Sequence, residues 1–88
     1  MPLFIIERNF ADAIELNRDD PDIKRVNDEV GVSWLYSFLS ADKRKTYCLY
    51  EAPSAELIRE SARRLNTPAD TIIEVNGPVG PELVPQPG

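Results

Sequence analysis

The sequence contains no histidine and one cysteine, Cys48, among its 88 residues. One cysteine cannot form an internal disulfide, and it argues for a reducing compartment. Without histidine, the chain lacks both the usual general base near neutral pH and the imidazole ligand that many transition metals favour. A glycine-rich phosphate loop, a nucleophile elbow and a histidine-based triad are also missing. These absences favour a role other than catalysis.

Long apolar runs and clustered positive charge are missing as well. No run approaches the ~20 apolar residues that span a bilayer, and the apolar N-terminus meets Glu7 and Arg8 at once, so we predict no signal peptide. Fifteen acidic residues oppose ten basic ones, giving a net charge of -5. This balance disfavours a nucleic-acid surface, which needs clustered positive charge. We expect a cytoplasmic protein that binds neither nucleic acid nor membrane.

The length allows one domain with a thin core, of the kind often supplemented by a metal or a partner subunit. Four of the eight prolines lie beyond Gly77. Proline pairs poorly in a sheet, so we predict a domain over residues 1–76 and a Pro-rich C-terminal tail over 77–88.

The pattern of the chain predicts six elements. Apolar, aromatic and β-branched residues indicate strands at 3–7, 32–39, 46–51 and 71–75. One helix is expected to begin at Asp20-Pro21, with Asn17 as a rival cap, and to end at Gly31. A second helix is expected after Ser54. The order of elements predicts an α+β fold of the ferredoxin-like βαββαβ type, a four-stranded antiparallel sheet with two helices on one face.

Two helices cover only one face of such a sheet, so the residues of strand 32–39 decide the character of the other face. Strict alternation offers it either Trp34, Tyr36 and Phe38 or the pair Leu35 and Leu39. An exposed apolar face usually marks an interface. We therefore predict a homodimer through the open sheet face, in a dimeric α/β-barrel-type assembly; an exposed aromatic stripe in a monomer is the alternative.

Four segments of the chain resemble a small bacterial nickel-binding protein family: Gly31–Phe38, Lys45–Pro53, Ile58–Ala62 and Pro68–Val75. The stretch Tyr47–Pro53 is the most specific of them. The resemblance implies a ferredoxin-like fold, a dimer and, in at least one branch, nickel binding, with no enzymatic activity firmly attached. Relatives often carry histidine around Tyr36 and Ser61, where this chain has none.

In the absence of histidine, the candidate metal ligands are Cys48, Glu7, Glu51 and Glu74. Thiolate is a soft metal ligand, and a carboxylate on a central strand is costly to bury unless it is paired or binds a metal ion. Alternatively, Cys48 is a small buried hydrophobe, and the glutamates are exposed at strand ends or paired with arginines. Aromatic walls for a small-molecule cleft would come from Trp34, Tyr36 and Tyr47. 

Three hypotheses follow. The first is a small dimeric metal-binding protein of the nickel family with altered ligands, holding nickel or another divalent metal. The second is a cofactor-free small-molecule-binding protein or enzyme that uses the open sheet face. The third is a structural or interaction module.

Overall fold

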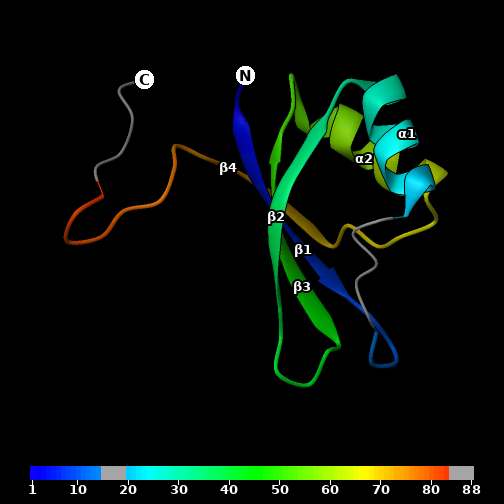
Figure 1. Cartoon of the computed structure of the whole chain (residues 1–88), viewed down its shortest axis with the longest axis horizontal. Coiled ribbons are helices and arrows are strands. Elements are labelled where there is room, and N and C mark those ends of the chain that lie inside the picture. The colour runs from blue at the N-terminus through cyan, green and yellow to red at the C-terminus, as the bar shows by residue number, and fades with distance from the viewer. Residues whose placement is uncertain (15–19, 84–88) are drawn as a thin grey trace.

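The computed structural model describes residues 1–14 and 20–83 and contains four strands and two helices in that part of the chain (Figure 1). In chain order the elements are β1 (Leu3–Asn9), α1 (Pro21–Val30), β2 (Ser33–Leu39), β3 (Lys45–Glu51), α2 (Ala55–Arg64) and β4 (Thr71–Val75). Each of the six elements expected from the sequence is present, with bounds within two residues for the strands.

The four strands form one antiparallel sheet in the order β2-β3-β1-β4, so that β1 and β3 occupy its centre. Both helices lie on the same side of this sheet, which leaves the other side without a covering helix (Figure 1). This arrangement confirms the predicted α+β ferredoxin-like fold.

The first helix begins and ends where the sequence signals place it. The Asp20 side chain accepts a hydrogen bond from the backbone N–H of Asp22, and Pro21 occupies the first turn, where its missing N–H costs nothing. Gly31 ends the helix with φ 89°, a left-handed conformation that glycine adopts without strain. The rival cap, Asn17, lies outside the described residues.

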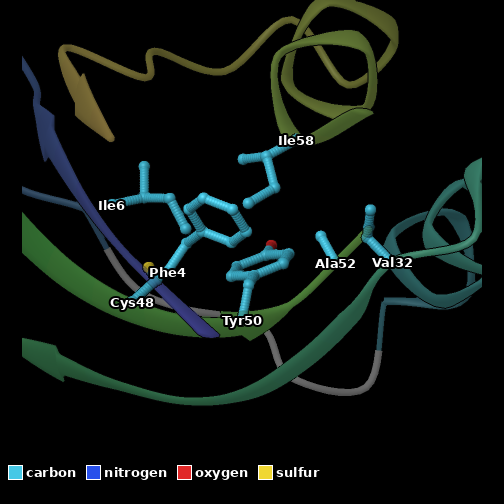
Figure 2. Close-up of a cluster of buried hydrophobic side chains, with 7 residues drawn as sticks. All are labelled: Phe4, Ile6, Val32, Cys48, Tyr50, Ala52 and Ile58. Atoms are coloured by element: carbon cyan, nitrogen blue, oxygen red, sulfur yellow. The ribbon is translucent and has the colours of Figure 1, made fainter. Parts of the chain in front are cut away.

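The hydrophobic core lies between the sheet and the helices. It consists of seven buried residues drawn in Figure 2: Phe4, Ile6, Val32, Cys48, Tyr50, Ala52 and Ile58. Ile6 and Ile58 are 0% and 1% exposed, and they point into the core from β1 and α2. Cys48 is part of this core, as the buried-hydrophobe interpretation predicts.

A β-bulge in β2 corrects the strict alternation expected for this strand. Trp34 pairs with Tyr50 on β3, but Tyr36 pairs with the very next residue, Leu49, so Leu35 is an extra residue. An extra residue shifts the phase of the side chains that follow it. Trp34 therefore lies on the helix side, whereas Tyr36 and Phe38 lie on the opposite side, and neither of the two sets expected from alternation occupies one face.

Beyond β4, the chain leads away from the helices (Figure 1). Gly80 and Leu83 form an isolated bridge there, and the division into a domain over 1–76 and a tail over 77–88 stays a prediction. Among the described helices, none is long and apolar enough to cross a membrane.

Candidate functional site

The sheet face away from the helices, called the open face from here on, is defined by the strand register. It carries fourteen residues: Leu3, Ile5, Glu7, Asn9, Ser33, Tyr36, Phe38, Lys45, Tyr47, Leu49, Glu51, Thr71, Ile73 and Val75. Most of them are apolar. Phe38 is 67% exposed, Ile73 55% and Tyr36 50%. A surface of this composition is unusual for a monomer that meets only water.

The two exposed rings on β2 are ordered relative to each other. The Tyr36 and Phe38 ring centroids lie 5.8 Å apart at an interplanar angle of 89°. This edge-to-face arrangement is favoured by the quadrupoles of the two rings. Tyr47 lies beside Phe38 across the β2–β3 ladder, so three aromatic side chains gather on this part of the open face.

Two carboxylates flank the apolar centre of the open face. Glu7 lies at the end of β1, where Lys45 Nζ is 3.7 Å from its Oε2 and Asn9 Nδ2 donates to the same oxygen at 3.2 Å. Glu51 lies toward the opposite end of the sheet, across from Leu3 and Ser33. The sequence suggested that Glu7 pairs with an arginine, but its described partner is Lys45.

The four metal ligands predicted from the sequence are not brought together within one chain. Glu7 and Glu51 lie on the open face, whereas Cys48 lies in the core on the helix side. Glu74 is exposed on the edge strand β4 and shares the helix side with Phe4. Over the part of the chain that the structure describes, no group of three or more His, Cys, Asp or Glu side chains is placed to hold a metal ion.

The structure also divides the predicted aromatic cleft. Tyr36 and Tyr47 share the open face, but the bulge at Leu35 places Trp34 on the helix side, where its indole N–H donates to Ser37 Oγ at 2.7 Å. Tyr36 and Ser61, the two positions singled out by the family resemblance, lie on opposite sides of the sheet: Ser61 is buried on α2.

The helix side holds a polar cluster that the sequence reasoning missed. The Ser61 hydroxyl donates to Asn27 Oδ1 at 2.6 Å, joining α2 to α1 within the core. Arg8, 6% exposed, donates to the Pro68 carbonyl oxygen, and its guanidinium carbon lies 5.9 Å from the Tyr50 ring centroid. Arg8 was detectable, because it follows Phe4 and Ile6 in the two-residue period of β1.

The environment of Tyr50 reflects this enclosure. Burial raises the pKa of the Tyr50 hydroxyl above its ordinary value of 10.0, while the charge of Arg8 opposes the shift. The hydroxyl is therefore harder to ionise than that of a tyrosine exposed to water.

A cavity of about 270 Å³ opens between the sheet and the first helix beside this cluster. Arg8, Tyr50, Thr46, Cys48 and Trp34 contribute to its wall from three strands, and Asn66 and Thr67 contribute from the loop after α2. Cys48 is enclosed here, with its Sγ 3.6 Å from Thr46 Oγ1.

Comparisons with known proteins agree with the fold. A family model described as nickel responsive protein SCO4226-like matches residues 4–75. Among solved structures, the crystal structure of SCO4226 from Streptomyces coelicolor A3(2) matches with a TM-score of 0.72 and 23% sequence identity, covering 88% of this chain and 99% of that chain. The comparison with curated protein sequences finds no match. At this identity the structural likeness supports the fold alone, whereas the family match spans both helices and the strands from Phe4 onward.

Proposed function

The chain belongs to the SCO4226-like family of nickel-responsive proteins, and we propose that it is a small dimeric protein that binds divalent metal ions with altered ligands. The family membership supports a response to metal. The observation that supports the altered ligands is the placement of Glu7 and Glu51 on an exposed apolar face, one toward each end of the sheet.

The donor atoms of a single chain do not fit a nickel site. The sequence has no imidazole, its one thiol is buried in the core, and the described part of one chain holds no group of three or more suitable ligands. Nickel(II) favours nitrogen and sulfur donors over carboxylates alone. The proposed site therefore lies between two chains.

The open face supports the second chain. Its exposed apolar residues, led by Phe38, Ile73 and Tyr36, lose their contact with water when two copies pack sheet to sheet. Such packing at about 10 Å spacing is the usual geometry of two facing sheets. The homodimer buries this face in the way that the helices bury the other.

A two-fold axis then determines which carboxylates meet. In an isologous interface, residue i of one chain contacts residue j of the other, and j contacts i. Glu7 and Glu51 are separated by about 13 Å along the strands, on either side of Ile5 and Leu49. With the axis through that centre, in the plane between the two sheets and perpendicular to the strands, Glu7 of one chain lies across from Glu51 of the second copy, at two equivalent places.

Carboxylate pairs of this kind change the expected metal preference. Oxygen ligands suit hard divalent ions such as manganese and magnesium as well as nickel, and they discriminate among them less than imidazole does. We expect binding that is weaker and less selective for nickel than a histidine site would give, and that requires the dimer.

The direct test is calorimetric titration of chelator-treated protein with nickel and with manganese, alongside sedimentation velocity of the same samples. We expect saturable binding near one ion per chain, with both metals bound by the dimer. Glu51→Gln should weaken binding about tenfold or more, because it removes one charged ligand from each site.

Cys48→Ala is the matched control, since the thiol faces the core and should not affect metal affinity. Loss of binding in Cys48→Ala, or unchanged binding in Glu51→Gln, would contradict the proposed ligands. A stable dimer that binds neither metal would favour the structural or interaction module instead.

A further inference from the structure

We propose that the cavity beside Arg8 is a binding site for a small carboxylate with an apolar body. This site lies on the helix side of the sheet and does not depend on the metal site proposed for the open face.

The first observation is a buried cation without a buried anion. Arg8 points from β1 into the interior with 6% of its surface exposed, and charged side chains are almost never buried to this degree unless they are paired. Its described contacts are the Pro68 carbonyl oxygen and Tyr50, through both the ring and the hydroxyl. Over residues 1–14 and 20–83, no carboxylate lies within ion-pair distance of Arg8.

The second observation is a cavity next to that cation. Arg8 lines the space of about 270 Å³, which is near the lower end of the range for small-molecule sites. A guanidinium carries five N–H donors in a planar fork that matches a carboxylate. No fully buried side-chain nitrogen or oxygen of the described residues lacks a hydrogen-bond partner, so what Arg8 lacks is an opposite charge. An anion in the cavity would supply the charge that no described carboxylate provides.

The remaining wall determines the class of ligand. Trp34, Ile23 and Leu65 provide apolar surface, and Thr46, Asn66 and Thr67 provide polar groups. The one described carboxylate on this wall, Asp20, already accepts the N-cap hydrogen bond from Asp22 N. A compact organic acid fits this combination better than inorganic phosphate, which would leave the apolar wall facing water.

The test uses ¹H–¹⁵N NMR of the labelled full chain with benzoate as the probe. Trp34 is the chain's single tryptophan and lines the cavity, so its indole N–H gives one assignable reporter signal at the site. We expect saturable shifts of this signal and of the amides of Thr46 and Thr67 at millimolar benzoate. Benzamide, which has the same shape without the charge, should bind about tenfold more weakly.

Variants separate the role of Arg8 from general charge effects. Arg8→Lys keeps the charge but loses the planar fork and should weaken benzoate binding, while Arg8→Gln should abolish it. Arg59→Gln, an exposed arginine on α2, should bind as the unaltered protein does. If Arg8→Gln does not fold, the difference in affinity between benzoate and benzamide for the unaltered chain still tests the proposal.

Three outcomes would overturn the proposal. These are equal shifts with benzamide, shifts confined to open-face residues such as Ile73, and an equal or stronger response to inorganic phosphate. The last would show an anion site that does not recognise the organic part of the ligand.

Discussion

The two faces of the sheet use the same strands in opposite ways. On the helix side, the core residues are packed to near-zero exposure and the buried polar ones are hydrogen-bonded: Asn27 to Ser61, and Arg8 to Pro68. On the open face, Tyr36, Phe38 and Ile73 are half exposed or more, although Leu49 among them is 8% exposed. The first face supplies the stability of one chain, and the second holds apolar surface available for association.

The largest expected effect comes from a matched pair of isoleucines, one on each face. Ile6→Ala empties a fully buried position and should lower the free energy of unfolding by about 2–5 kcal/mol. Ile73→Ala, at a position 55% exposed, should cost well under half of that in the monomer. Chemical denaturation at low protein concentration measures both.

Equal losses for the two isoleucine variants would contradict the division of roles between the faces. The proposed dimer adds a second comparison, because at high concentration Ile73→Ala should also raise the dimer dissociation constant whereas Ile6→Ala should act on the fold.

The next effect concerns the buried hydrogen bond between the helices. Ser61→Ala leaves Asn27 Oδ1 without its donor in the core, and we expect a loss of about 1–3 kcal/mol. The double variant with Asn27→Leu removes both polar partners and should be less destabilised than the two single losses added together. Thermal denaturation of the four proteins gives this coupling; additive losses would show that the bond contributes nothing specific.

A third effect isolates the aromatic part of the open face. Phe38→Ser should weaken the proposed dimer about tenfold or more while leaving the monomer's thermal midpoint nearly unchanged, since the ring is 67% exposed in one chain. Sedimentation equilibrium measures the dissociation constant. Lys43→Ser, at the exposed β2–β3 hairpin, is the control and should leave association unchanged. A dimer unaffected by Phe38→Ser would place the interface elsewhere.

The smallest effect lies on the outer surface of α2. Hydrogen bonds from Arg63 and Arg64 lower the pKa of Glu60 from 4.5 to about 2. A lowered pKa in the folded state gives stability that is present above pH 4.5 and is lost as the pH falls toward 2. Glu60→Gln should therefore flatten the decline of the thermal midpoint over that window, modestly, because the pair is exposed to solvent.

Glu74→Gln provides the reference for this pH series, because Glu74 is exposed on β4 and makes no ion pair within the described residues. If the thermal midpoints of both variants fall with pH at the same slope, the ion pairs of Glu60 do not contribute to stability in acid.

Local signals in the sequence predicted the elements well because each signal acts over a few residues. Asp20, Pro21 and Gly31 define the first helix by capping chemistry alone. The phase of β2 could not be predicted in this way, because the bulge at Leu35 exists only in relation to β3. For the same reason, alternation wrongly grouped Trp34 on one face with Tyr36 and Phe38.

The candidate sites were harder to predict than the fold. Alternation within β3 correctly places Cys48 and Glu51 on opposite faces of the sheet. Which of these faces Glu7 and Glu74 share depends on how β1 and β4 pair with their neighbours. The buried cation at Arg8 was visible in the period of β1, yet the cavity beside it requires α1 and the loop after α2 to be in place. Metal binding by the predicted ligands stays a prediction.

The position of β1 in the sheet has a consequence for how the chain folds. β1, which precedes the other three strands in the chain, pairs on one side with β3 and on the other with β4, so that Leu3 meets Val75. Contacts between such distant parts of a chain carry a large loop-closure cost and slow folding. Until Thr71–Val75 has emerged from the ribosome, one edge of β1 has no strand to pair with, and the nascent chain carries an apolar edge that is open to aggregation.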